Sequence, residues 1–191
     1  MKRSEVMTII ARYRKGAPAV AGPGATSGTL WASGHDPATI YNMEMGYSIP
    51  ICFGVAQARP DQKVLALEGE GSAILGLSAL ATIGRYQPRN LVAIVFDNGV
   101  YGTGGGTIET GTRHGTDIAA VARACGIEES ITVTDLNEAE RVISRAFDEV
   151  GPWFLVMVTE PSDTRERPRP GVDHVEAAYA FRNALNAKGL P

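Results

Sequence analysis

Apolar positions along the chain fall into two kinds of segment. Short continuous apolar runs, typical of strands buried on both faces, occupy residues 18–21, 63–67, 90–96, 130–133 and 153–158. Segments with apolar residues at helical spacing predict helices over residues 4–15, 45–58, 73–83, 117–125, 136–147 and 174–188. Strands that alternate with helices predict a three-layer α/β fold, in which helices cover both faces of a doubly wound, mainly parallel sheet.

Local signals set the expected ends of several helices. Ser4 is the expected N-cap of the first helix, Asp36-Pro37 is a typical helix start, and Gly84 is expected to stop the helix over residues 73–83. The Gly/Ser/Thr-rich stretch after residue 21 is expected to form a loop.

The length and the absence of repeats predict one domain. The chain has 191 residues, enough for one substantial core. It shows no internal repeat, and the first change of character is a polar, Pro-rich arm that begins at Glu160. We therefore expect a single domain over residues 1–191, with a C-terminal arm and helix over about residues 160–191.

The composition is ordinary for a globular protein, with 44% hydrophobic and 20% charged residues. A formal net charge of −3 gives no reason to expect nucleic acid or an anionic membrane as a partner. The sequence has no signal-peptide pattern and no run of 18 apolar residues, and Cys52 and Cys125 lie in apolar segments without metal-ligand spacing. A cytoplasmic protein with reduced cysteines is expected.

Two glycine-containing loops each follow a predicted strand. The first is Gly69-Glu70-Gly71 and the second is Asp97-Asn98-Gly99. In parallel sheets, ligands bind at the carboxyl ends of the strands, and these loops are expected to share that edge. This edge is the first candidate for a functional site.

The two loops together resemble the thiamine-diphosphate motif. That motif is a Gly-Asp-Gly followed by an Asn-Asn pair some twenty-five to thirty residues later, and here Gly69-Glu70-Gly71-Ser72 precedes Asn98-Gly99-Val100-Tyr101-Gly102, with 28 positions from Glu70 to Asn98. The motif belongs to the diphosphate-binding (PP) domain of thiamine enzymes, and the resemblance runs from about Val20 to Pro161. Residues 78–84 and 97–102 are especially similar to the β subunits of sulfopyruvate decarboxylase and to the matching half of phosphonopyruvate decarboxylase.

The resemblance implies a set of site residues. Mg²⁺ (or Ca²⁺) would be held by the carboxylate of Glu70, the amide oxygen of Asn98 and the backbone carbonyl of Val100. Gly71 and Ser72, at the start of a helix, would supply N–H donors to the diphosphate. Further implied cofactor contacts are the Met43 carbonyl, the wedge-forming Met45, and Gly69, Tyr101, Gly102, Thr26 and Ser27.

The chain departs from the family pattern in two ways. Glu70 stands where the family has aspartate, so that either the loop has shifted or the metal site is weaker. The PP domain uses the whole length, which leaves no room for the pyrimidine-binding (PYR) domain whose glutamate activates the cofactor. The resemblance therefore implies an α subunit that carries this domain, in a hetero-oligomer of dimers.

These observations predict the β subunit of a two-chain, thiamine-diphosphate-dependent 2-oxo acid decarboxylase. Arg113 and His114 are either a contact for an anionic substrate group or an exposed polar pair, and Thr103-Gly104-Gly105-Gly106-Thr107 is either an anion cradle or a lid. Alternative hypotheses are an acetolactate synthase-like carboligase subunit and a noncatalytic regulatory subunit. A nicotinamide-binding Rossmann protein is disfavoured by its different glycine spacing.

Overall fold

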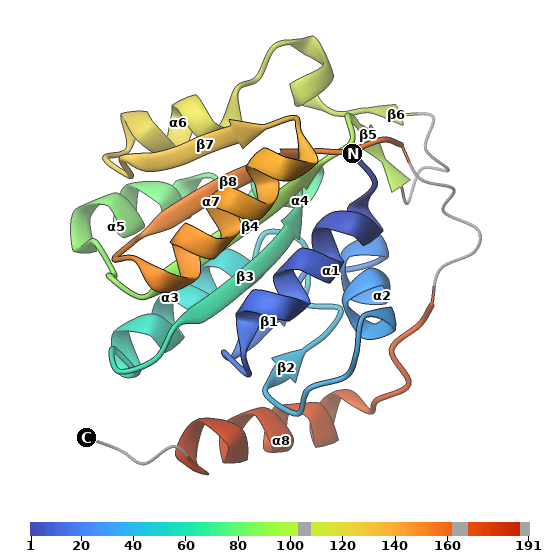
Figure 1. The fold of residues 1–191 in the computed structure, drawn as a ribbon, viewed down its shortest axis with the longest axis vertical. Coiled ribbons are helices and arrows are strands. Elements are labelled where there is room, and N and C mark those ends of the chain that lie inside the picture. The colour runs from blue at the N-terminus through green and yellow to red at the C-terminus, as the bar shows by residue number, and fades with distance from the viewer. Residues whose placement is uncertain (103–107, 162–167, 188–191) are drawn as a thin grey trace.

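The computed structural model of the chain describes residues 1–102, 108–161 and 168–187. Its middle layer is a six-stranded sheet in the order β2-β1-β3-β4-β8-β7, with parallel neighbours throughout (Figure 1). These strands are β1 (Ala19–Ala21), β2 (Thr39–Ile40), β3 (Val64–Gly69), β4 (Leu91–Asp97), β7 (Glu129–Val133) and β8 (Trp153–Val158). Two short antiparallel strands, β5 (Val100–Tyr101) and β6 (Ile108–Glu109), form a separate ribbon after β4.

The three central strands carry the core. β3, β4 and β8 are buried along nearly their whole length, which accounts for their continuous aliphatic and aromatic side chains. In the observed register Gly69 pairs with Phe96, and Asp97 pairs with Val158. The carboxyl ends of β3 and β4 therefore lie side by side, as expected.

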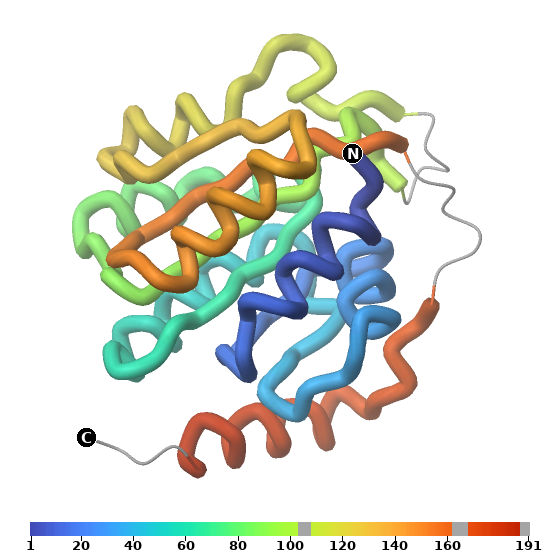
Figure 2. Tube along the Cα trace, viewed as in Figure 1, coloured from blue at the N-terminus to red at the C-terminus, as the bar shows by residue number. Residues whose placement is uncertain are grey.

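Helices cover both faces of the sheet (Figures 1 and 2). One core cluster joins the sheet to α1 (Arg3–Arg14), α2 (Ala25–Ala32) and α7 (Leu136–Asp148). The other joins it to α3 (Ser48–Ala58), α4 (Glu70–Leu75), α5 (Ser78–Tyr86), α6 (Ile118–Ala124) and α8 (His174–Ala187). This arrangement confirms the predicted fold class of a doubly wound α/β sheet. Within the described residues, no helix is both long and apolar enough to span a membrane.

The first helix begins earlier than predicted. Lys2 is its N-cap, and the backbone N–H of Lys2 donates to the Glu5 carboxylate at 2.9 Å. Ser4 therefore lies inside α1, and its predicted role as the cap is wrong. The earlier start makes Arg3 the first residue of the helix.

The stretch after β1 forms a helix where a loop was predicted. Residues 25–32 build α2, although they include Thr, Ser and Gly, because Leu30 packs into the core of the sheet. The brief helix predicted at Asp36-Pro37 does not form. Instead, the Asp36 carboxylate accepts a hydrogen bond from the Ala38 N–H at 2.7 Å, and the chain continues into the edge strand β2.

The single helix predicted over residues 73–83 is two helices. It breaks between α4 and α5 at Gly76, where a Cβ atom would lie 2.7 Å from the Gly46 carbonyl oxygen. Gly84 was predicted to end the helix but lies within α5. A glycine is needed there because the end of α6 packs against it: a Cβ at Gly84 would lie 1.7 Å from the Cys125 carbonyl oxygen. Both glycines serve close contacts between distant segments.

The segment after β5 contains elements that the sequence did not predict. Besides the β5–β6 ribbon, Gly111–His114 form a 3-10 turn. The proposed cradle or lid at Thr103-Gly104-Gly105-Gly106-Thr107 lies outside the described residues.

Candidate functional site

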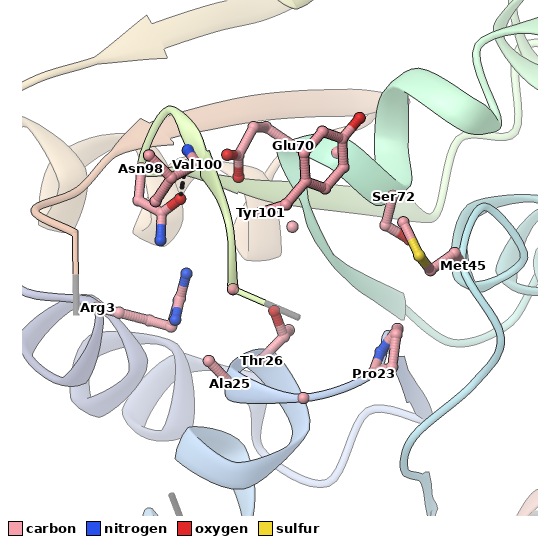
Figure 3. Close-up of a pocket in the computed structure, with 14 residues that line it drawn as sticks. Arg3, Pro23, Ala25, Thr26, Met45, Glu70, Ser72, Asn98, Val100 and Tyr101 are labelled. Carbon is pink, nitrogen blue, oxygen red and sulfur yellow. Dashed lines mark hydrogen bonds between the residues drawn. The ribbon is translucent and has the colours of Figure 1, made fainter. Parts of the chain in front are cut away.

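A pocket of about 80 Å³ opens at the carboxyl edge of the sheet, several times the space that one ordered water needs. The segments that follow β1, β2, β3 and β4 form it together with the first residue of α1 (Figure 3). Its lining consists of Arg3, Pro23, Gly24, Ala25, Thr26, Met45, Gly69, Glu70, Gly71, Ser72, Asn98, Val100, Tyr101 and Gly102. Most of the residues predicted as cofactor or metal contacts are therefore brought together at this one place.

The N-terminus of α2 points its first turn into the pocket. Its N-cap is Gly24, with φ of +71°, and no side chain caps the helix there. The first N–H groups of a helix have no partner within the helix and carry its positive dipole end, so they favour an anion. Thr26 is 2% exposed and lines this part of the pocket. The region predicted as a loop thus brings the start of a helix, where an anion would be favoured, to the pocket.

Ser27 turns away from the pocket. Its hydroxyl donates to the Gly22 carbonyl at 2.8 Å and accepts from the Asn42 N–H at 2.7 Å. Ser27 is fully buried, and it is not among the lining residues. In this structure it braces the loop before α2.

Glu70 is a buried carboxylate at the centre of the site. It is 3% exposed, and its Oε1 accepts a hydrogen bond from the Thr110 hydroxyl at 3.2 Å. Burial raises the pKa of Glu70, and nearby Asp97 raises it further, while the backbone N–H of Asn98 and the Thr110 hydroxyl oppose the rise. Among the described residues, no lysine or arginine forms an ion pair with Glu70. Such a carboxylate is well placed for a bound cation.

Asn98 and Val100 complete the oxygen-rich side of the pocket. The Glu70 carboxylate points toward both residues, and the Asn98 Oδ1 accepts from the Val100 N–H at 3.1 Å (Figure 3). An amide oxygen has two lone pairs, so this hydrogen bond leaves one for a further partner. Within the described residues no three His, Cys, Asp or Glu side chains gather as a metal cluster. A divalent ion here would rely on amide and carbonyl oxygens beside Glu70, a donor set that suits Mg²⁺ or Ca²⁺.

The ring of Tyr101 covers Gly71. A Cβ at Gly71 would lie 2.2 Å from Cε1 of Tyr101, so only glycine permits this contact. Gly71, Tyr101 and Gly102 all line the pocket. A larger residue after Glu70 would therefore displace the Tyr101 ring from its observed position.

Glu68 is a second buried carboxylate, which sequence reasoning did not single out. It is fully buried, and its oxygens accept from the Ser48 N–H at 2.8 Å and from the Ser72 hydroxyl. The Ser72 Oγ in turn accepts from the Gly46 N–H at 2.8 Å. Burial raises the pKa of Glu68, and the hydrogen bonds from Ser72 and Ser48 oppose the rise. Through this chain of contacts Glu68 fixes the loop that carries Met45.

Besides Ser27, three predicted contacts lie outside the pocket. Met43 is partly buried and packs against the core, and its N–H donates to the Ala21 carbonyl at 3.0 Å. Arg113 and His114 are exposed and face Glu109, with nitrogen–oxygen distances of 3.7 and 3.0 Å. The geometry of Arg113 and His114 is that of an exposed polar cluster.

Comparison with known proteins identifies the family. The profile of the thiamine pyrophosphate enzyme, C-terminal TPP binding domain matches residues 27–157, which is more than half of the chain. The chain belongs to this family. Most of the residues that line the pocket lie within the part of the chain that matches this thiamine pyrophosphate (TPP) domain.

Several relatives share the TPP domain. A phosphonopyruvate decarboxylase from Streptomyces viridochromogenes is 33% identical over 138 residues, which are 72% of this chain and 34% of that protein. The chain thus spans about a third of the length of that relative. The sulfopyruvate decarboxylase subunit beta of Methanococcus maripaludis is 28% identical over 186 residues, covering 97% of this chain and 98% of the relative. The crystal structure of benzoylformate decarboxylase from Polynucleobacter necessarius has the same fold, with a TM-score of 0.72 and 18% identity over 88% of this chain and 34% of that one.

The residues of the pocket fit the TPP diphosphate. The start of α2 offers N–H donors to an anion, and Glu70 with Asn98 offers hard oxygen ligands to a divalent ion. Sequence reasoning missed Arg3 and Glu68, since an arginine in a first helical turn and a glutamate in a strand are common surface residues. The signal that was present is their position: Glu68 lies in β3 directly before the motif loop, and Arg3 lies at the end of α1 that meets the carboxyl edge.

Proposed function

We propose that this chain is the diphosphate-binding, β-type subunit of a two-chain, thiamine-diphosphate-dependent 2-oxo acid decarboxylase. The observation that carries the proposal is the buried Glu70 carboxylate, which faces Asn98 across a pocket that also receives the N-terminus of α2. The relatives described above include decarboxylases of 2-oxo acids with phosphonate or sulfonate tails, which supports a substrate of this class.

The residues of this chain have separate tasks in this function. Glu70, Asn98 and the Val100 carbonyl hold the divalent ion, and the α2 start holds the diphosphate. Met45 lines the pocket on the loop that Glu68 and Ser72 brace, where it supports the cofactor rings from one side. When bound, the cofactor supplies the carbon nucleophile and the electron sink that decarboxylation requires.

A partner subunit completes the site in this proposal. The match over nearly the whole length of a β subunit supports it. Two large apolar side chains near the pocket are exposed, Tyr47 at 58% and Leu75 at 67%, as expected for a surface that another chain covers. The partner would supply the pyrimidine-binding domain, in a hetero-oligomer of dimers.

The test is an assay of the chain with and without a co-expressed chain that carries a pyrimidine-binding domain. We expect release of carbon dioxide and an aldehyde from phosphonopyruvate or sulfopyruvate in the presence of both chains, Mg²⁺ and thiamine diphosphate. The isolated chain should show no turnover. Appreciable activity of the isolated chain would contradict the two-chain proposal, and a coupled hydroxyketone in place of the aldehyde would indicate a carboligase. Cofactor binding without any turnover by the assembled pair would indicate a regulatory subunit.

A further inference from the structure

Arg3 is the cationic side chain among the residues that line the pocket. It is the first residue of α1, which runs antiparallel to the strands and so brings its N-terminal turn to the carboxyl edge. Arg3 is 8% exposed, and its guanidinium carbon lies 5.6 Å from the centroid of the Phe96 ring. Figure 3 shows the guanidinium pointing into the space between Asn98 and Thr26.

We propose that Arg3 is a diphosphate-binding residue, whose guanidinium donates hydrogen bonds to phosphoryl oxygens in the pocket. This inference rests on the proposed function and adds a residue to it. The family match begins at residue 27, so it does not include Arg3. The assignment comes from the burial, direction and charge of this side chain.

Charge balance supports the assignment. A divalent ion bound to Glu70 has one positive charge left, and a diphosphate carries more negative charge than that. The neutral N–H groups of α2 supply dipoles but no full charge. Arg3 adds a full positive charge on the side of the pocket opposite the Glu70 loop (Figure 3). Its planar fork also matches two phosphoryl oxygens at once, which an ammonium group does not.

The position of Arg3 on a rigid element favours phosphate binding over a loose surface contact. Its side chain is held against Phe96 by cation–π contact, and α1 is anchored by Val6, Met7 and Ile10 in the core. A preorganised guanidinium loses little conformational freedom when an anion arrives. A diphosphate should therefore gain affinity from Arg3 without a rearrangement of α1.

The test uses inorganic pyrophosphate with Mg²⁺ as the probe, titrated calorimetrically into the full chain. The residues proposed to contact the diphosphate belong to this chain, so the probe tests them directly. We expect Arg3→Gln to weaken pyrophosphate binding about tenfold to a hundredfold, and Arg3→Lys to fall between that variant and the wild type. Arg12→Gln is the matched control, because Arg12 lies on the same helix, is exposed, and pairs with Glu140. It should leave the affinity unchanged.

Thermal unfolding of the same variants separates binding from a structural contribution. If Arg3 only stabilises α1, Arg3→Gln will lower the melting temperature and leave the pyrophosphate affinity of the folded chain intact, which would overturn the inference. The inference also fails if wild type and Arg3→Gln bind thiamine diphosphate and pyrophosphate equally, and the proposed function would then stand without Arg3. If the wild-type chain binds neither compound, the proposed diphosphate site and the Arg3 inference both fail.

Discussion

Glu68 and Glu70 lie on either side of Gly69 at the end of β3, and both are buried with raised pKa values, yet their surroundings differ. Glu68 is surrounded by protein donors, with a backbone N–H and a hydroxyl satisfying its two oxygens. Glu70 lies beside another carboxylate, Asp97, and opens onto a pocket. The comparison shows that burial alone does not mark a ligand. Protein donors reach both carboxylates, so what distinguishes Glu70 is the like charge of Asp97 and the pocket beside it.

The Glu70→Gln variant is expected to show the largest effect and tests the comparison most directly. If Glu70 binds the ion, the variant loses the charge of a hard-ion ligand while the Thr110 hydroxyl keeps its acceptor. Because changes in residues that merely orient a metal ligand cost about 10–100-fold in affinity, we expect a loss of more than about a hundredfold in Mg²⁺-dependent thiamine diphosphate affinity. Stability should be unchanged or higher, since a desolvated charge beside Asp97 is removed. Calorimetric titration and urea unfolding measure the two effects.

The opposite result, a loss of stability without a loss of cofactor affinity, would contradict the role of Glu70 as a metal ligand. If Glu70→Gln binds the cofactor normally and is less stable, Glu70 is a structural residue that holds the Thr110 loop. The Glu68→Gln variant is its matched control, because it makes the same chemical change two positions away, at the end of β3.

Glu68→Gln should have a smaller effect on cofactor binding and a larger one on stability. Glutamine turns an N–H donor toward a hydroxyl or a backbone N–H that needs an acceptor, which leaves a buried polar group unpaired. Urea unfolding should show a loss of about 1–3 kcal/mol. A fully stable Glu68→Gln variant that no longer binds the cofactor would contradict the assignment of Glu68 to the scaffold.

The pH dependence of that loss is a further readout of the same variant. Burial raises the pKa of Glu68 above its ordinary value of 4.5, so the folded chain keeps this proton to a higher pH than the unfolded chain. The contribution of Glu68 to stability is therefore fully present below the unfolded pKa and declines as the pH rises through the folded pKa. The stability difference between wild type and Glu68→Gln should be largest in mildly acidic solution and should narrow toward neutral pH, while Glu70 titrates in both proteins and largely cancels. A difference that grows with pH would show that the pKa is lowered instead.

The doubly wound, mainly parallel sheet and the placement of the two motif loops could be predicted from the sequence. Continuous apolar runs mark buried parallel strands, and loops after neighbouring strands must share the carboxyl edge. The break at Gly76 could not be predicted, because it depends on the Gly46 carbonyl, which approaches from a distant loop. The helix after Gly24 was missed because its composition favours a loop, and core packing through Leu30 outweighs that preference.

Side-chain direction explains the remaining differences at the site. Thr26 and Ser27 are neighbours with similar hydroxyl groups, but Thr26 lines the pocket and Ser27 braces the loop behind it. Arg3 contributes to the pocket from the far end of the sequence, through the direction of α1. Such roles depend on tertiary geometry, which periodicity does not encode.

The central claim is that one pocket of this chain binds a diphosphate through a divalent ion held by Glu70 and Asn98. The most direct measurement is calorimetric titration of thiamine diphosphate into the full chain, in Mg²⁺ and in EDTA, for the wild type and for Asn98→Ala. Asn137→Ala is the control, because Asn137 lies in the first turn of α7, away from the pocket. We predict saturable binding that requires Mg²⁺, survives in Asn137→Ala and is lost in Asn98→Ala, whose fold remains intact by circular dichroism. Equal affinity in EDTA, or unchanged affinity in Asn98→Ala, would contradict the claim.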